Sequence, residues 1–169
     1  MEKAGVQVEH LKILLLSDSH GRTDKVLSVV DRNKKNITCV IHLGDYARDI
    51  KAVENAYPSI ITEAVQGNND GSSEYPLDKV LMFSGKRILL THGHTYKVGR
   101  DLMPLAMKAK QENAGIAVFG HTHIPLIEEK DGIYLINPGC LFRPRSLMGP
   151  TYSLLEISEF NIHADIYSY

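Results

Sequence analysis

The sequence has little cysteine, almost no net charge and no long hydrophobic run. Its two cysteines, Cys39 and Cys140, provide neither a disulfide framework nor a cysteine cluster for structural zinc, which favours a reducing, cytoplasmic location. Nineteen Lys and Arg residues are balanced by twenty Asp and Glu residues, and the formal net charge of −1 excludes a global positive field that would gather nucleic acid or anionic membrane. The longest uninterrupted aliphatic run, 13–16, is far too short to span a bilayer, and residues 1–10 lack the apolar core of a signal peptide. We therefore expect a cytoplasmic protein that is neither exported nor bound to a membrane.

What the sequence does have is an ordinary globular composition and a group of clustered histidines. With 169 residues, 43% hydrophobic and 23% charged, it is expected to form a single domain over residues 1–169 around one core. Five of its eight histidines lie in three short stretches beside Gly, Ser or Thr, and they are His20, His92, His94, His121 and His123. Function is expected where these histidines gather.

Aliphatic strands and amphipathic helices alternate in the first half of the chain. Strands are predicted at 12–17, 37–43 and 60–65. The helices between them begin after Thr23, which can serve as the N-cap, and near Ile50. Such alternation implies a parallel sheet with right-handed crossovers.

The second half of the chain has a different pattern, in which paired strands are joined by short turns. The predicted elements are hairpins at 79–91, 126–136 and 151–167, a helix at 102–111 and a strand at 116–119. In the last strand, four apolar residues are expected to face one way, and they are Phe160, Ile162, Ala164 and Ile166.

Five of the predicted strands end in loops that carry Asp, Asn or His. The side chains in these loops are Asp18, His20, Asp45, Asn68, Asn69, Asp70, His92, His94, His121 and His123. Since ligands bind beyond the carboxyl ends of strands in open α/β sheets, we expect the five loops to form one site. Carboxylate and imidazole ligands without thiolate suit Mn²⁺, Fe²⁺, Ni²⁺ or Zn²⁺ better than Ca²⁺ or Mg²⁺. The ligands exceed the need of one tetrahedral ion, which favours two ions about 3.5 to 4 Å apart that share a carboxylate.

Each motif also has an ordinary structural interpretation. Asp-x-His alone is typical of loop capping and Gly-Asp of a turn, so it is the joint occurrence of five loops that favours a metal site. His42, in an apolar strand, is interpreted as a hydrogen-bonded group behind the ligands and not as a ligand. His94 could touch substrate, donate a proton or hydrogen-bond its own loop. For Arg48, Arg143 and Arg145, a phosphate contact and a solvated surface position are both left open.

Taken together, the motifs resemble those of a known family, the calcineurin-like metallophosphoesterases, in its small bacterial and archaeal phosphodiesterase branch. The resemblance runs from about residue 13 to residue 155 and rests on the five loops, on Asn-Pro-Gly at 137–139 and on Pro-Arg at 144–145. It implies an α/β fold of two mixed β-sheets packed as a sandwich and flanked by helices, with a dinuclear metal centre at the strand ends. The ligands that it implies are Asp18, His20 and His123 for the first ion, Asn68, His92 and His121 for the second, and Asp45 as the bridge. The ions are expected to be Mn²⁺, with Ni²⁺, Fe²⁺ or Zn²⁺ as alternatives.

Two positions depart from the pattern of the family. Many members have a histidine where this chain has Asn69, and the resemblance implies that such a histidine protonates the leaving group or contacts the phosphate. Asn69 cannot donate a proton in that way, so another group such as His94 would have to protonate the leaving group. Asn69 and His94 are therefore the candidate catalytic residues. Cys140 follows Asn-Pro-Gly where the branch usually has serine, which is an isosteric exchange. Arg48 and Arg145 are the candidate substrate-binding residues.

The resemblance implies metal-dependent phosphodiester hydrolysis by a hydroxide that bridges the two ions. Two divalent ions bring about four positive charges, and Asp18, Asp45 and the hydroxide remove three, which leaves about one charge to balance a diester monoanion. The sequence shows no evident cationic cluster for the second charge of a monoester. Alternatives are a protein-interaction scaffold of the retromer-subunit type, a nuclease and a phosphomonoesterase. The expected partner is a small phosphodiester, not nucleic acid or a membrane, and a homo-oligomer is left open.

Overall fold

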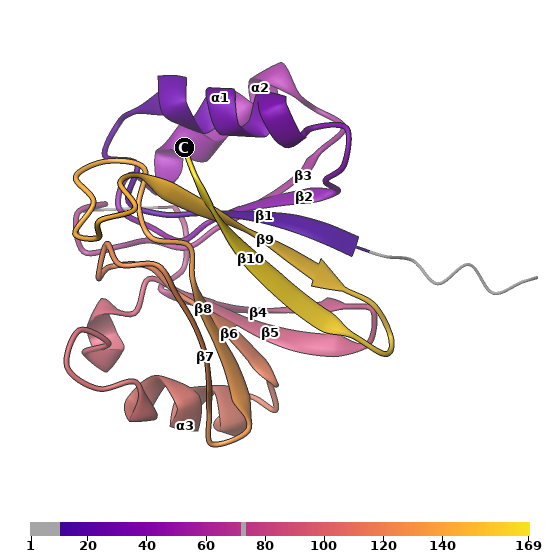
Figure 1. Cartoon of the computed structure of the whole chain (residues 1–169), viewed down its shortest axis with the longest axis vertical. Coiled ribbons are helices and arrows are strands. Elements are labelled where there is room, and N and C mark those ends of the chain that lie inside the picture. Colours follow the sequence, from indigo (N-terminus) through magenta and orange to yellow (C-terminus); the bar gives the residue numbers. More distant parts are fainter. Residues whose placement is uncertain (1–10, 72–73) are drawn as a thin grey trace, which may run out of the picture.

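Two five-stranded β-sheets lie between helical layers in the computed structural model of the chain (Figure 1). Helices α1 (Thr23–Asn33) and α2 (Ile50–Ala56) cover the outer side of one sheet, and α3 (Met103–Gln111) covers the outer side of the other. This arrangement confirms the predicted sandwich of two mixed sheets flanked by helices.

The structure describes residues 11–71 and 74–169. The expectation that no signal peptide is present concerns residues 1–10, which lie outside the described residues. No helix in the described part of the chain is long and apolar enough to cross a membrane.

The first sheet has the strand order β10-β9-β1-β2-β3. Its strands are β1 (Leu11–Leu16), β2 (Cys39–His42), β3 (Ile61–Ala64), β9 (Thr151–Ile157) and β10 (Ile162–Ser168). Strands β1, β2 and β3 run parallel, as the alternation of strands and helices predicted. Leu16 lies opposite His42, and His42 lies opposite Ala64. β9 pairs antiparallel with both β1 and β10. Because β1, β2 and β3 are parallel and in register, the loops that follow them leave the sheet at the same edge.

The second sheet has the strand order β4-β5-β6-β8-β7. Its strands are β4 (Asp78–Phe83), β5 (Lys86–Thr91), β6 (Ile116–Val118), β7 (Leu126–Lys130) and β8 (Ile133–Asn137). β5, β6 and β8 run parallel, and β4 and β7 pair antiparallel at the two edges as the arms of the predicted hairpins. The carboxyl ends of β5 and β6 therefore also lie at one edge.

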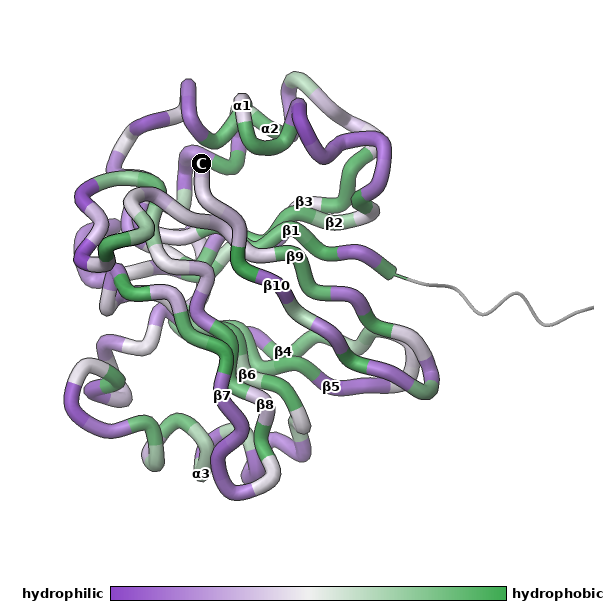
Figure 2. Tube along the Cα trace, viewed as in Figure 1, coloured by the Kyte–Doolittle hydropathy of each residue, from purple (hydrophilic) through white to green (hydrophobic). Residues whose placement is uncertain are grey.

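The layer between the two sheets is a continuous apolar core. Fully buried side chains come to it from both sheets, and they include Ile13, Leu15, Ile41, Ile88, Leu90, Ile116, Val118 and Ile136. Burying one such aliphatic side chain contributes about 1.5–3 kcal/mol relative to leaving it exposed. Figure 2 shows hydrophobic residues, in green, along the central strands and hydrophilic residues, in purple, mainly in the turns and loops. A shift of one residue in the strand register would turn these side chains out of the core. The core therefore fixes the register of each strand and with it the position of the loop that follows.

The start of α1 differs from the prediction. Thr23 is the first helical residue and not the N-cap, which is Arg22, and no side chain caps this helix end. Arg22 instead donates hydrogen bonds to Asp24, with an Nε to Oδ1 distance of 2.8 Å. The amphipathic pattern itself is confirmed, because Val26, Val29 and Val30 are buried against the first sheet.

The last strand also starts later than predicted. Phe160 was expected to face the same way as Ile162, Ala164 and Ile166, but it lies in the turn before β10 and is 81% exposed. The turn is closed by hydrogen bonds between Ser158 and Asn161, whose backbone N to O distance is 2.9 Å, and this leaves Phe160 outside the ladder. Ala164 faces the core and is 6% exposed.

Candidate metal centre

Loops from both sheets carry the predicted ligands to one edge of the sandwich. Five of the seven line a single cavity of about 490 Å³, and they are His20, Asp45, Asn68, His121 and His123. The other two, Asp18 and His92, are fully buried beside them, and His92 Nε2 lies 4.0 Å from Asp18 Oδ1. The structure thus brings together side chains that lie more than 100 positions apart in the sequence.

Four of these residues form a compact cluster. One ligand atom from each of Asp18, His20, Asp45 and His123 lies within 4.8 Å of the others. His123 Nε2 is 3.0 Å from Asp18 Oδ1, and His20 Nε2 is 3.6 Å from Asp45 Oδ2. Two carboxylates and two imidazoles at this spacing could hold a divalent transition-metal ion.

A second group lies on the other side of Asp45. His92 Nε2 is 3.4 Å from Asp45 Oδ1, whereas His20 approaches the opposite oxygen, Oδ2. The rings of His92 and His121 are 5.1 Å apart between centroids, and Asn68 lines the same cavity as Asp45 and His121. Asp45 therefore has one carboxylate oxygen toward each group of ligands.

His92 Nε2 is fully buried at the centre and has no hydrogen-bond partner among the described residues, and the fully buried Asp18 Oδ1 meets His123 Nε2 at 3.0 Å. An unpartnered buried polar atom costs about 1–3 kcal/mol, so such atoms are uncommon unless something else binds them. His92 Nδ1 lies 2.7 Å from the carbonyl oxygen of Leu43, and a carbonyl can accept only, so Nδ1 carries the proton and Nε2 offers a lone pair. His123 Nδ1 donates in the same way to the carbonyl oxygen of Arg143, at 2.9 Å. The residues present thus fit a metal ion.

The carboxylates and imidazoles shift the pKa values of one another. Burial alone would raise the pKa of Asp18, but the adjoining His123 and His92 hold it below its ordinary value. The Asp18 carboxylate raises the pKa of His123 to about 10, with a smaller contribution from Cys140. Burial, and then the neighbouring His92, lower the pKa of His121. Since metal ions bind deprotonated imidazole, a proton and an ion compete for His123 Nε2.

The ligand loops are held in strained backbone conformations. Five of the seven predicted ligands have positive φ angles, between 46° and 70°, and they are Asp18, His20, Asp45, His121 and His123. Such conformations cost about 1–3 kcal/mol each for residues other than glycine and persist only where the surroundings impose them. A glycine at position 67 is required, because a Cβ there would lie 2.3 Å from Asp45 Oδ1. Strain at these positions marks them as a functional site.

A buried network behind the ligands fixes the loop that carries His20. Ser19 Oγ donates a hydrogen bond to Asp49 Oδ2 at 2.7 Å, and the backbone nitrogen of Gly21 donates to the same oxygen at 2.9 Å. His42 Nε2 lies 2.8 Å from Ser19 Oγ, and His42 Nδ1 accepts from the backbone of Gly44. His42 is therefore a supporting group, as interpreted from the sequence. Asp49 was missed, because nothing in its local sequence separates it from a surface acid.

Asn69 is hydrogen-bonded to the carboxylate between the two groups. Its side-chain Nδ2 donates to Asp45 Oδ2 at 2.6 Å, and its backbone nitrogen donates to Asp45 Oδ1 at 2.9 Å. Asp70 then binds the backbone nitrogens of Asp45, Ala47 and Gly67. These contacts orient Asp45 and leave the Asn69 amide occupied.

His94, the second candidate catalytic residue, lies beside the second group of ligands. Its ring centroid is 5.4 Å from that of His92 and 6.1 Å from that of His121. His94 Nδ1 is buried without a hydrogen-bond partner among the described residues, and burial followed by the neighbouring His92 lowers its pKa. It lines a cavity of about 430 Å³ together with Lys97 and Arg100.

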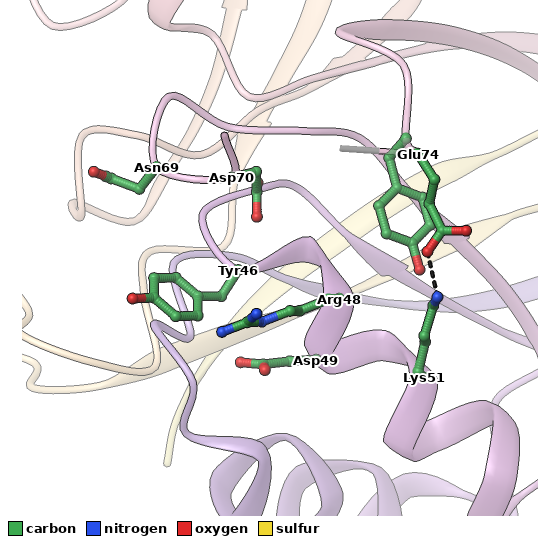
Figure 3. Close-up of a pocket in the computed structure, with 8 residues that line it drawn as sticks. Tyr46, Arg48, Asp49, Lys51, Asn69, Asp70 and Glu74 are labelled. Carbon is green, nitrogen blue, oxygen red and sulfur yellow. Dashed lines mark ion pairs between the residues drawn. The ribbon is translucent and has the colours of Figure 1, made fainter. Parts of the chain in front are cut away.

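Cationic side chains surround the mouth of the centre, contrary to the expectation that no such cluster exists. Arg143 and Arg145 line the cavity of the ligands, Lys97 and Arg100 line the cavity of His94, and Arg48 lines an adjoining cavity of about 570 Å³ (Figure 3). The sequence did not show this cluster because its members come from three loops that meet only in the fold.

An α/β sandwich with buried Asp and His side chains where the strand ends of two sheets meet defines a class of metal-binding hydrolases. The chain belongs to the calcineurin-like phosphoesterase superfamily, whose domain matches residues 11–159. It is 35% identical over 158 residues to a probable metallophosphoesterase of Mycoplasma pneumoniae, and the match covers 89% of this chain and 92% of that protein. It is 31% identical over 146 residues to a phosphodiesterase of Methanocaldococcus jannaschii, over 76% of this chain and 83% of that protein.

Solved structures share the same fold. A conserved uncharacterized protein of Streptococcus pneumoniae TIGR4, described as a predicted phosphoesterase, superposes with a TM-score of 0.79 at 27% identity and covers 95% of this chain and 90% of its own. Vacuolar protein sorting 29 of Cryptosporidium parvum superposes with a TM-score of 0.72 at 18% identity, over 95% of this chain and 99% of its own. At that identity the likeness shows the fold alone.

Proposed function

We propose that this chain is a metal-dependent phosphodiesterase with two ions in one centre. The observation that carries the proposal is the position of Asp45, whose two carboxylate oxygens lie 3.6 Å from His20 Nε2 and 3.4 Å from His92 Nε2. A carboxylate placed between two groups of ligands can bridge two ions, whereas a single-ion site would leave the second group without a role.

Each group of ligands would hold one ion. Asp18, His20 and His123 would bind the first, Asn68, His92 and His121 the second, and Asp45 both. When bound, two divalent ions supply a water nucleophile at neutral pH and stabilise negative charge that develops at phosphorus. The mixed oxygen and nitrogen donors favour Mn²⁺, with Ni²⁺, Fe²⁺ or Zn²⁺ as alternatives.

Protein side chains supply the remaining parts of the reaction. Asn69 holds Asp45 through its amide and cannot serve as an acid, so His94 is the group that we assign to protonate an alkoxide leaving group. Because the pKa of His94 is lowered, only the protonated fraction of this residue acts as the acid. Arg145 lines both the ligand cavity and a neighbouring apolar cavity of about 310 Å³, where it can bind a phosphate oxygen.

The preference for a diester rests on two arguments. Counting two ions, two carboxylates and a hydroxide leaves about one positive charge at the centre, which matches a monoanion. The relative in M. jannaschii is named a phosphodiesterase. The arginines at the mouth add positive charge that a monoester can also use, so the matching monoester is the control substrate.

The test is turnover of two aryl phosphates under matched conditions. The chain is stripped with a chelator, reloaded with Mn²⁺ and assayed with bis(p-nitrophenyl) phosphate and p-nitrophenyl phosphate. We expect a higher kcat/KM for the diester and no turnover by the stripped protein. A higher value for the monoester would assign a phosphomonoesterase instead. A folded protein that turns over neither substrate with any of the four metals would contradict the proposal and favour the interaction scaffold.

The free state of the cysteines supports the proposed cytoplasmic location. Cys39 and Cys140 are both buried and unpaired, as in a reducing compartment. Burial raises the pKa of the Cys39 thiol to about 12, so this thiol stays protonated and unreactive.

A further inference from the structure

Two aromatic rings flank the predicted ligand His20, and an arginine lies over each of them. The ring centroid of His20 is 5.5 Å from that of Tyr46 and 6.1 Å from that of Phe142. Arg48 Cζ lies 5.2 Å from the Tyr46 ring, and Arg143 Cζ lies 5.0 Å from the Phe142 ring. The two pairs are called here the Tyr46–Arg48 pair and the Phe142–Arg143 pair.

Neither guanidinium group of the two pairs has another polar partner among the described residues. Arg48 and Arg143 are exposed, and their side chains form no ion pair or hydrogen bond with any residue in 11–71 or 74–169. Lys51, the other cation of the cavity in Figure 3, is by contrast paired with Glu74. The two arginines are therefore free to contact a ligand.

Strained backbone ties each pair to a metal ligand. Tyr46 has a φ angle of 69° and directly follows Asp45, which itself has a φ angle of 56°. Arg143 has a φ angle of 57°, and its carbonyl oxygen accepts the hydrogen bond from His123 Nδ1. Because positive φ is costly for these residues, the position of each pair is imposed by the centre and is not that of a loose surface loop.

Each pair lines a cavity of the size that a substrate group needs. The Tyr46–Arg48 pair lines the cavity of about 570 Å³ in Figure 3, and the Phe142–Arg143 pair lines the ligand cavity of about 490 Å³. Asn69 lines both, so the two cavities adjoin at the metal centre. Pockets for small ligands typically measure about 300–1,000 Å³.

The charges in the larger cavity decide what kind of group it can take. Arg48 and Lys51 supply two positive charges there, and three carboxylates, those of Asp49, Asp70 and Glu74, also line it. This balance disfavours a second phosphate group. A ring with a guanidinium over it and hydrogen-bonding groups around it instead suits a planar, uncharged, polar group, and nucleobases stack on aromatic rings and on arginine in this way.

We propose that the two pairs bind the two ester groups of the substrate on either side of the metal centre, and that this substrate is a small phosphodiester joining two nucleosides. The inference rests on the proposed phosphodiesterase activity. The nucleoside on the side of the larger cavity stacks on Tyr46 and Arg48, and the other stacks on Phe142 and Arg143. Two separate pairs accommodate two bases, so no gain is expected from a longer strand.

The first test compares two diesters with the same leaving group, methyl p-nitrophenyl phosphate and the p-nitrophenyl ester of thymidine 5′-monophosphate. Stacking one base predicts a kcat/KM about tenfold higher for the thymidine ester. Tyr46→Leu and Arg48→Ala should reduce this ratio, and Tyr46→Phe should keep it. Arg32→Ala is the matched control, because Arg32 Cζ lies 4.8 Å from the Tyr169 ring in the same geometry and lines none of these cavities.

The second test asks whether the Phe142–Arg143 pair binds the second nucleoside. Thymidylyl-thymidine and the methyl ester of thymidine monophosphate differ in the second nucleoside, so Phe142→Leu and Arg143→Ala should lower kcat/KM for the dinucleotide more than for the methyl ester. Phe142→Tyr should preserve the difference. Because the arginine side chains are exposed, Arg48→Ala and Arg143→Ala keep the test valid even if a ring substitution impairs folding.

The outcomes separate this inference from the function on which it rests. Hydrolysis of both nitrophenyl diesters with equal kcat/KM would keep the phosphodiesterase and overturn the stacking pairs. A thymidine preference that Tyr46→Leu and Arg48→Ala leave unchanged would also overturn them, and so would a strong further preference for longer oligothymidylates. If neither diester is hydrolysed, binding is measured by calorimetry. The pairs still predict that thymidine 5′-monophosphate binds more tightly than methyl phosphate, and that Arg48→Ala removes this difference in affinity. Equal affinities would overturn the pairs.

Discussion

The interior of the metal centre and its rim are built in opposite ways. Asp18 and His92 are fully buried, and their loops are cross-linked by backbone and side-chain hydrogen bonds. The guanidinium groups of Arg48 and Arg143 at the rim are exposed and lie over the rings of Tyr46 and Phe142. Under the proposed function, we therefore expect interior residues to set the rate for every substrate and rim residues to set the preference among substrates. Substitutions in the two regions should be distinguishable by this criterion.

The largest effect is expected at Asp45, where the two groups of ligands meet. Losing a residue that merely supports a ligand costs about 10- to 100-fold in metal affinity or activity, so Asp45→Ala should lower kcat/KM by more than about 100-fold. It should cost more than Asp18→Ala, because Asp45 approaches both groups and Asp18 mainly the first. Steady-state assays with bis(p-nitrophenyl) phosphate measure this. Equal losses in the two variants would remove the bridging role of Asp45.

The next effect is expected at His94 and depends on the leaving group. Positioned acids contribute about 10²- to 10⁴-fold in rate, so His94→Asn should slow an alkyl-leaving diester by about 100-fold or more. A nitrophenyl diester should be slowed far less, because nitrophenolate departs without a proton. Parallel assays of thymidylyl-thymidine and bis(p-nitrophenyl) phosphate measure the difference. If both substrates slow by the same factor, His94 is not the acid.

A smaller effect is expected at Asp49, which holds the His20 loop without touching the ligand atoms. Asp49→Ala removes the acceptor for Ser19 and Gly21, and it should weaken metal binding by about 10- to 100-fold. Asp31→Ala is the control, because this exposed carboxylate contacts only Lys34 and Tyr57 among the described residues. Calorimetric titration with Mn²⁺ measures the affinity. Unchanged affinity in Asp49→Ala would show that the loop keeps its shape without the network.

The smallest effect is a pH dependence of stability from His42. Burial lowers the pKa of His42, so below the ordinary histidine value of 6.5 the unfolded chain binds a proton that the folded chain does not. The free energy of unfolding should therefore decrease as the pH falls below 6.5, by up to about 1.4 kcal/mol per pH unit from this residue.

Urea unfolding of the metal-free chain at neutral and mildly acidic pH measures this slope. His42→Gln should make the slope shallower, and His163→Gln, which replaces an exposed histidine on β10, should not. An equal slope in His42→Gln and the unmodified chain would contradict the assignment of a neutral, buried His42.

Most of the interior could be predicted from the sequence, because its signals are local. Asp18 and His20, or His121 and His123, are two positions apart and follow a run of aliphatic residues, so a strand and its loop identify them together. The parallel register of β1, β2 and β3 then places their ends side by side, which is a general property of such sheets. The arrangement of the remaining strands in a second, mixed sheet was expected only from the resemblance to the family.

The rim and the supporting network could not be predicted, because they depend on contacts between distant segments. Tyr46 and Phe142 lie 96 positions apart and meet only around His20. Asp49 looks like any acid at the start of a helix until the fold brings Ser19 and Gly21 to its oxygen. Errors at the ends of elements, such as Thr23 and Phe160, arose where side-chain contacts and turns decided the boundary.

Metal stoichiometry tests whether one chain binds two metal ions through a shared Asp45. The purified chain is saturated with Mn²⁺, desalted and analysed for manganese and protein, with Asp45→Ala treated in parallel. We expect a ratio near two ions per chain, and a lower ratio in Asp45→Ala. A ceiling of one ion in the unmodified chain would contradict it.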